Sequence, residues 1–220
     1  MELENKVVFL NFDKVIDTIT ALSGGGLILV GSRPSVGKTW FALKIIETMA
    51  NKHGKSSCIF SIEMSKEAIE KRLSIMNFDI NNNLMHLIDK PNIDLSEIIE
   101  IIKRKKHEAG VKLFFIDYLS LIGNKENKDI FENAKELKSL AIEENIVLVG
   151  LMQLDRNTNN PKPEITNFKS TENHADIIIA LCHSEKSMNL SEKEIEIQIL
   201  KDDKKPSVVN RLSRSFSYEV

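Results

Sequence analysis

Apolar runs along the chain alternate with stretches of helical periodicity. The runs at residues 27–30, 57–62, 113–116, 146–152 and 177–182 have the length and continuity of buried strands. Between them, apolar residues recur every three or four positions, as on the buried face of a helix. This alternation predicts an α/β fold built on a mostly parallel sheet that is flanked by helices.

Helices are expected between the strands and near the N-terminus. Helical spacing covers residues 12–22, 40–49, 66–78, 95–106 and 130–144. Asp94 directly precedes one of these segments and is a candidate N-cap, because its carboxylate can accept the first backbone N–H groups. The remaining turns are marked by Gly, Asn and Pro.

The two ends of the chain and one long connection have a different character. Residues 7–10 could form a short strand, whereas residues 194–200 and 211–220 alternate between polar and apolar. Alternation predicts half-buried strands, so we expect antiparallel additions and a β-rich C-terminal edge. The polar stretch at residues 155–172 is too long for an ordinary turn, and a connection of that length is usually functional or mobile.

Composition narrows the class of protein. The 220 residues are 42% hydrophobic and 28% charged with a formal net charge of −2, so no global basic field attracts nucleic acid. Cys58 and Cys182 lie in apolar runs, which predicts buried thiols in a reducing compartment. No apolar stretch approaches the ~20 residues of a transmembrane helix and the N-terminus does not resemble a signal peptide. We therefore expect a cytoplasmic protein that does not contact a membrane.

One loop carries a clear chemical signal. Residues 31–39 read Gly-Ser-Arg-Pro-Ser-Val-Gly-Lys-Thr, between an apolar run and an amphipathic stretch that begins at Trp40. A strand, a tight loop and a helix form the context of a phosphate-binding loop, where Lys38 would contact the β- and γ-phosphates and Thr39 would bind Mg²⁺. The general pattern has glycine where this chain has Ser32. The alternative is an ordinary turn that contains Gly-Lys-Thr.

Four polar residues each follow a predicted strand: Lys38, Glu63, Asp117 and Gln153. In an open parallel sheet these strand ends converge on one crevice. Hydrolysis of a nucleoside triphosphate needs a phosphate cradle, a metal, a group that orients water and a sensor of the γ-phosphate. We predict that Thr39 and Asp117 are the metal ligands. Glu63 would polarise the attacking water, and Gln153 would contact the γ-phosphate.

Several short motifs in this chain resemble those of the DnaB-type replicative helicases. They stand at residues 32–39 (SRPSVGKT), 60–65 (FSIEMS), 115–119 (FIDYL), 137–141 (LKSLA), 152–156 (MQLDR) and 174–176 (HAD). Arg-Pro-Ser inside the phosphate loop, together with Glu-Met-Ser, is more specific than a phosphate loop alone. The resemblance runs from about residue 22 to residue 220. It implies a RecA-like phosphate-loop NTPase, with residues 1–26 as an N-terminal segment and residues 27–220 as a single RecA-like ATPase domain.

The resemblance also implies ATP and Mg²⁺ as cofactors. Nucleotide would be bound by the phosphate loop, the residue after it and two distant cations: Ser32, Arg33, Pro34, Ser35, Val36, Gly37, Lys38, Thr39, Trp40, Arg72 and Lys201. Glu63, Lys38 and Gln153 would be catalytic. Arg72 would lie beside the base of the bound nucleotide. Family members form hexameric rings around single-stranded DNA, so single-stranded DNA and further copies of this chain are the expected partners.

The chain departs from the family pattern near its N-terminus and in its long connection. Its phosphate loop begins near residue 31, so we expect the amino-terminal collar domain to be absent, and contact with primase to be absent with it. Residues 155–175 form a shorter stretch than the family's counterpart, which contributes DNA-binding loops. Within that stretch Lys162 and Lys169 are our candidates for DNA contact.

A third departure affects catalysis. The family ends a late strand with Lys-x-Arg, which reaches the γ-phosphate of the neighbouring subunit. This chain keeps Lys201 but has Asp203 at the arginine position. A replacement cation would have to come from Arg156, Lys204 or Lys205.

The interpretation is a DnaB-type motor domain that hydrolyses ATP and acts on single-stranded DNA in replication, and two alternatives stay open. The first is a regulator or accessory protein of replication or recombination that binds ATP but hydrolyses it poorly. The second is a small-molecule enzyme, although the sequence shows no lid-like arginine cluster. The basic run at residues 103–106 is interpreted as a solvated last helical turn rather than a DNA patch, because cations favour helix C-termini.

Overall fold

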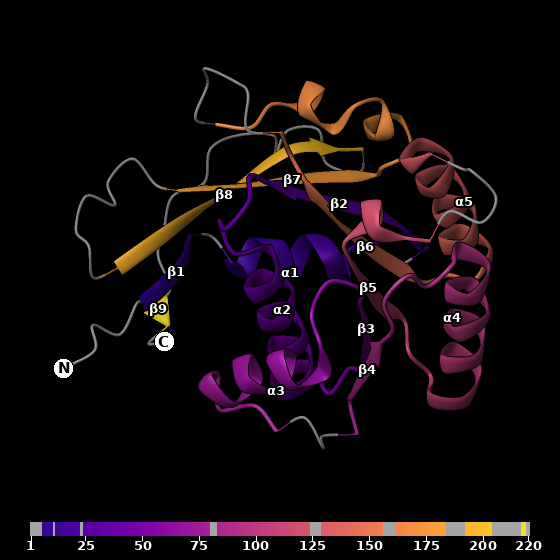
Figure 1. The fold of residues 1–220 in the computed structure, drawn as a ribbon, viewed down its shortest axis with the longest axis horizontal. Coiled ribbons are helices and arrows are strands. Elements are labelled where there is room, and N and C mark those ends of the chain that lie inside the picture. The colour runs from indigo at the N-terminus through magenta and orange to yellow at the C-terminus, as the bar shows by residue number, and fades with distance from the viewer. Residues whose placement is uncertain are drawn as a thin grey trace.

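A computed structural model describes residues 6–10, 12–22, 24–79, 83–123, 129–155, 162–183, 192–203 and 217–218. These residues form one twisted sheet with helices on both faces (Figure 1). The strands are β1 (Lys6–Leu10), β2 (Gly26–Ser32), β3 (Ser57–Ser61), β4 (Met85–Asp89), β5 (Leu113–Asp117), β6 (Val147–Gln153), β7 (Ile177–His183), β8 (Glu192–Asp202) and β9 (Ser217–Tyr218). The helices are α1 (Phe12–Thr20), α2 (Lys38–His53), α3 (Lys66–Ile75), α4 (Leu95–Ala109) and α5 (Ile130–Glu143).

The described residues build a nine-stranded sheet in the order β4-β3-β5-β6-β2-β7-β8-β1-β9. Neighbours are parallel from β4 to β7, whereas β8 runs antiparallel to β7 and β9 antiparallel to β1. The mostly parallel sheet with added antiparallel strands at one edge is therefore confirmed. The five predicted helices are also present.

Two hydrophobic cores lie on opposite faces of the sheet. The helices α1, α2 and α3 cover one face, and α4 and α5 cover the other (Figure 1). Alternate strand residues enter alternate cores, so Ile28 and Val30 pack with the first group of helices, while Leu27 and Leu29 pack with the second. Burial on both faces explains why the central strands are continuously apolar.

Helix α1 belongs to the same core as α2 and α3. β1 pairs in parallel with β8, and α1 buries its apolar stripe against α2, where the rings of Phe12 and Phe41 meet edge to face at 6.0 Å. Residues on both sides of the boundary predicted at residue 26 therefore contribute to one hydrophobic core.

Two cations of the basic run at residues 103–106 pair with a carboxylate at the end of α5. Lys106 Nζ lies 2.6 Å from Glu144 Oε2, and Lys103 Nζ lies 3.7 Å from Glu144 Oε1. The hydrogen bond from Lys106 lowers the pKa of Glu144. Asp94 occupies the N-cap position of α4 as predicted, but its side chain makes no capping hydrogen bond.

Neither β4 nor the short 3-10 helices η1 (Leu119–Leu121), η2 (Ile165–Phe168) and η3 (Thr171–Asn173) were expected from the pattern of apolar residues. β4 is an edge strand whose residues are mostly half-buried, and His86 interrupts its apolar run. Such a strand lacks the continuous hydrophobicity of a central one. Among the described residues, no helix has the length and apolar character needed to cross a bilayer.

Candidate nucleotide-binding site

Four neighbouring parallel strands end at the same edge of the sheet. Ser61 of β3 is in register with Asp117 of β5, and Ser32 of β2 is in register with Gln153 of β6. Backbone hydrogen bonds continue past these positions, from Ile62 N to Asp117 O and from Leu154 N to Ser32 O, both at 2.9 Å. The convergence of strand ends predicted from the sequence is therefore present.

A cleft of about 600 Å³ opens at this edge. The predicted site residues that line it are Pro34, Ser35, Gly37, Lys38, Thr39, Trp40, Glu63, Arg72, Asp117 and Gln153. Met64 and Tyr118, which the sequence did not single out, line it as well. Ser32, Arg33, Val36 and Lys201 are not part of the lining. The cleft thus gathers the phosphate loop, both predicted metal ligands and the predicted catalytic carboxylate.

The phosphate loop is shaped to leave a helix N-terminus open to an anion. Gly37 is the N-cap of α2 with φ 115°, a left-handed conformation that favours glycine, and it provides no side chain to cap the helix. The first backbone N–H groups of α2 are therefore left without a side-chain cap at the cleft. Together with the helix dipole, they provide the setting in which helix N-termini bind phosphate.

Ser32 has a specific role at the position where the general pattern has glycine. Its side chain is fully buried, its hydroxyl donates to Arg33 O at 2.8 Å, and its Oγ lies 3.2 Å from Lys38 Nζ. Lys38 is also largely buried, and this burial lowers its pKa, an effect that the nearby carboxylates of Asp117 and Glu63 oppose. Ser32 therefore holds the ammonium group of Lys38 inside the loop.

The two predicted metal ligands are in direct contact. Thr39 Oγ1 donates a 2.7 Å hydrogen bond to Asp117 Oδ2, and Asp117 is only 1% exposed. Burial raises the pKa of Asp117, while the hydrogen bond from Thr39 acts in the opposite direction. Its other oxygen, Oδ1, is buried without a hydrogen-bond partner.

This donor set fits Mg²⁺. A buried carboxylate oxygen that lacks a partner needs a donor or a cation, and Mg²⁺ prefers one or two protein oxygens with phosphate and water oxygens as its remaining ligands. The described residues contain no cluster of three or more His, Cys, Asp or Glu side chains that could hold a metal by themselves. A site completed by phosphate oxygens is consistent with both observations.

The remaining cleft residues differ in exposure. Glu63 and Gln153 are exposed to the opening, whereas Trp40 and Arg72 are half-buried. The guanidinium carbon of Arg72 lies 5.7 Å from the centre of the Trp40 ring. Burial lowers the pKa of Arg72, and the charges of Asp117 and Glu63 oppose that shift.

Lys201 lies away from the cleft of its own chain. It pairs in register with Ile178 near the start of β7, whereas the cleft lies at the other end of the parallel strands. Its Nζ donates to Glu172 O at 3.0 Å and to Ala175 O at 2.6 Å, and lies 3.2 Å from Asp203 Oδ2. Arg156, Lys204 and Lys205 lie outside the described residues.

Sequence reasoning missed one residue that touches the phosphate loop. Phe168 of η2 is fully buried, and a Cβ atom at Gly31 would come within 2.5 Å of its ring. Thr171 donates to Phe168 O and to Met152 Sδ, which fixes this segment to the end of β6. The available signals were that Phe168 is the one aromatic residue in the polar stretch at residues 155–172 and that Gly31 stands one residue too early for the motif.

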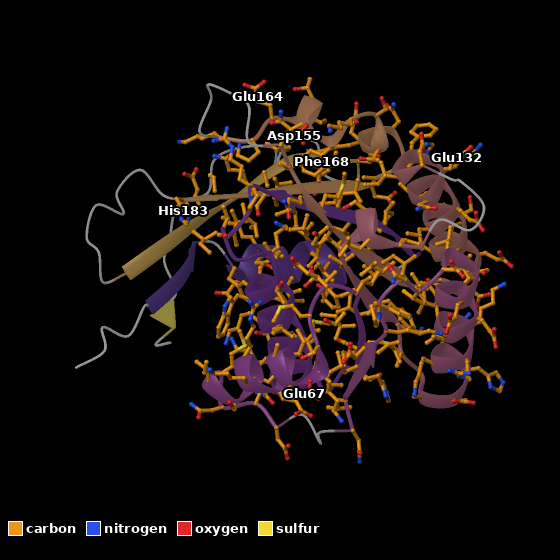
Figure 2. All side chains as sticks on the ribbon, viewed as in Figure 1. Glu67, Glu132, Asp155, Glu164, Phe168 and His183 are labelled. Atoms are coloured by element: carbon orange, nitrogen blue, oxygen red, sulfur yellow. The ribbon has the colours of Figure 1, made fainter. Side chains whose placement is uncertain are left out.

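The two lysines predicted to contact DNA from the long connection form ion pairs with carboxylates of the same chain. Lys169 Nζ lies 2.8 Å from Asp155 Oδ2, and Lys162 Nζ lies 3.7 Å from Glu196 Oε2. The first pair is about two-thirds exposed, and Figure 2 shows Asp155 near the top of the view, where this connection runs.

The family of the chain follows from its sequence. Residues 7–87 and 76–214 match the family described as DnaB-like helicase C terminal domain. This chain belongs to the DnaB-like helicase C-terminal domain family. The resemblance inferred from the short motifs is thereby confirmed.

Curated relatives of this DnaB-like domain are longer proteins. It is 31% identical over 242 aligned residues to "Replicative DNA helicase DnaC" of Bacillus subtilis (strain 168), covering 93% of this chain and 53% of the relative. It is 31% identical over 211 residues to "Replicative DNA helicase DnaB" of Geobacillus stearothermophilus, covering 79% of this chain and 46% of the relative. The chain spans about half the length of these relatives.

Solved structures show the same fold. One solved ATPase domain matches with a TM-score of 0.68 and 21% identity over 95% of this chain and 87% of that one. A DnaB-like replicative helicase studied with primase matches with a TM-score of 0.68 and 23% identity over 87% of this chain and 56% of that one. These likenesses confirm the RecA-like fold of the DnaB-like domain.

Proposed function

We propose that this DnaB-like domain is an ATP-hydrolysing motor of the helicase type that acts on single-stranded DNA in replication. The observation that carries the proposal is the Thr39–Asp117 pair, whose buried and unpartnered carboxylate oxygen lies in the same cleft as Lys38. Two relatives named as replicative DNA helicases support the same assignment. Residues 27–220 would form the single ATPase domain.

Six polar residues of the site have a role in this proposal. Thr39 and Asp117 would hold Mg²⁺, which when bound neutralises phosphate charge. Lys38 and the N-terminus of α2 bind the phosphates, with Ser32 keeping Lys38 in place. Glu63 orients water and accepts its proton, while Gln153 donates to the γ-phosphate and thereby senses its loss.

The partners of the domain are single-stranded DNA and further copies of the chain, assembled as a ring that is hexameric in the family. Lys162 and Lys169 are the proposed DNA contacts. Because each is paired with a carboxylate, DNA phosphates have to displace Glu196 and Asp155 to reach them. A location in the cytoplasm is proposed on the basis of the buried thiols of Cys58 and Cys182.

The decisive experiment measures ATP hydrolysis with and without single-stranded DNA, alongside mass in solution with and without nucleotide. We expect DNA-stimulated hydrolysis and nucleotide-dependent assembly. Lys38→Ala is the control that removes phosphate binding. The variant should still fold, because the ammonium group of Lys38 contacts the phosphate loop and the cleft rather than a hydrophobic core. ATP binding and turnover that survive in a folded Lys38→Ala protein would rule out this site.

One observation favours a second function. Lys201 is already paired with Asp203, so the cation that would act on a neighbouring subunit is partly neutralised. A domain of this kind could bind ATP and regulate replication or recombination while hydrolysing it poorly. ATP binding without DNA-stimulated hydrolysis would favour the regulator over the motor.

A further inference from the structure

Trp40 is the one tryptophan of the sequence, and it stands directly after the phosphate loop on the first turn of α2. The guanidinium group of Arg72, a residue of α3, lies over the indole ring of Trp40. The guanidinium carbon is 5.7 Å from the centre of the ring. Both side chains are half-buried and line the cleft. This distance is within the range in which an aromatic face attracts a cation.

The place of Trp40 in the chain shows which part of the cleft Arg72 lies beside. Trp40 directly follows Thr39 on the first turn of α2, and both residues line the cleft together with Arg72. Because the phosphate loop ends at Thr39, the guanidinium group held over Trp40 lies next to that loop. The charges of Asp117 and Glu63 act on Arg72 as they do on Lys38, which supports this placement. The resemblance alone places Arg72 beside the base.

The geometry of the pair leaves the donors of Arg72 available. A guanidinium group presents its N–H donors in its own plane, and stacking on an aromatic ring uses its face. An arginine whose guanidinium carbon lies over the Trp40 ring can therefore direct N–H donors toward oxygen atoms. The edge of a guanidinium group matches the spacing of phosphate oxygens, which a point charge such as lysine does not.

We propose that Trp40 is a positioning residue that holds Arg72 so that its guanidinium edge donates to the terminal phosphates of the nucleotide. The proposal rests on the proposed function, because it requires the cleft to bind ATP. Arg72 then supplies, from within the same chain, a cation at the phosphates. Such a cation matters here because Asp203 stands where the family pattern has an arginine from the neighbouring subunit.

Trp40 fluorescence tests the placement directly in the wild-type protein. The protein is titrated with Mg-ATP, Mg-tripolyphosphate and adenosine, and tryptophan emission is recorded. We expect emission to change with ATP and with tripolyphosphate, which contact Arg72, and not with adenosine. Arg72→Ala should abolish the change caused by tripolyphosphate. A full response to adenosine with none to tripolyphosphate would show that the base stacks at this place, which would overturn the proposal.

Turnover of variants tests the positioning role. Arg72→Ala should lower kcat about ten-fold or more, with a smaller effect on KM, because a donor aimed at developing charge acts in the transition state. Trp40→Ala should lower kcat similarly, whereas Trp40→Phe should restore it to within about three-fold, since phenylalanine keeps an aromatic face. Lys71→Ala, an exposed neighbour on α3, is the matched control and should be neutral.

The double variant separates positioning from a general packing effect. If Trp40 acts through Arg72, then Trp40→Ala with Arg72→Ala is no slower than Arg72→Ala alone. Additive losses, or a normal kcat in Arg72→Ala, would overturn the proposal. If Trp40→Ala does not fold, the fluorescence titration and the Trp40→Phe variant still decide. Calorimetry with Mg-ATP distinguishes failure of the proposed function from failure of this inference. Absence of ATP binding overturns the proposed function, whereas ATP binding with unchanged tryptophan emission overturns only the role of Trp40.

Discussion

The hydroxyl of Thr39 donates a 2.7 Å hydrogen bond to Asp117 Oδ2 and so joins the first turn of α2 to the end of β5. The two residues are 78 positions apart in the sequence. Their contact brings two oxygen ligands within reach of one small cation, and it does so at the mouth of the phosphate loop. Burial of the Asp117 carboxylate in this pair also lowers the stability of the folded protein.

Asp117→Asn should weaken Mg²⁺-dependent ATP binding and stabilise the protein without nucleotide. Burial raises the pKa of Asp117, so its contribution to stability is complete below the ordinary pKa of about 3.9 and is lost as pH rises through the folded value. Asparagine carries no such loss, and its uncharged amide costs less to bury than a carboxylate. We expect a higher Tm at pH 7, by about 2–4 °C for each kcal/mol relieved.

The measurement is thermal unfolding of wild type and Asp117→Asn from pH 4 to pH 8, with ATP affinity determined in the presence and absence of Mg²⁺. The gain in Tm should shrink toward pH 4. Thr39→Ser is the matched control, because it keeps the hydroxyl and should retain Mg²⁺-dependent binding. A variant Asp117→Asn that is less stable than wild type at pH 7 would contradict the expectation.

Glu63→Gln should bind ATP normally and hydrolyse it about 10²–10⁴-fold more slowly, because it keeps the shape of the side chain but removes the general base. Single-turnover hydrolysis and ATP affinity are measured together. Glu67→Gln is the control, since Glu67 is an exposed carboxylate on the first turn of α3, labelled in the lower part of Figure 2. Equal rates in the two variants would show that Glu63 has no role beyond ending its strand.

Asp203→Arg should raise turnover in a manner that depends on protein concentration. An arginine supplied by a neighbouring subunit can contribute about 10³–10⁵ in rate, whereas Asp203 pairs with Lys201 instead. Turnover is measured against protein concentration for wild type, Asp203→Arg and Asp203→Asn, the last of which only removes the carboxylate that pairs with Lys201. Fast wild-type hydrolysis that none of these substitutions changes would mean that another residue supplies the cation.

Removing the carboxylate partners should strengthen binding to single-stranded DNA. Asp155→Asn and Glu196→Gln release Lys169 and Lys162, so affinity at low salt should rise. Lys169→Ala and Lys162→Ala should each reduce the dependence of log affinity on log salt by about one unit. Lys103→Ala on α4 is the control and should leave the salt dependence unchanged. An unchanged salt dependence in all the lysine variants would place the DNA contact elsewhere.

The fold and the centre of the cleft could be predicted because their signals are local. Central strands are continuously apolar, and the residues that follow them, such as Glu63, Asp117 and Gln153, meet at one edge as a matter of topology. β4 was missed because a half-buried edge strand lacks that signal. The pairing of Lys201 with two carbonyl oxygens and Asp203 could not be predicted either, since it depends on how β8 meets the start of β7.

The contact between Gly31 and Phe168 links two parts of the chain that would otherwise change independently. No side chain larger than that of glycine fits at residue 31 while the ring of Phe168 fills the space beside it. A larger side chain at residue 31 would need a smaller one at residue 168. The two positions should therefore vary together during divergence. The room for a side chain at the start of the phosphate loop is therefore set by a residue far along the chain.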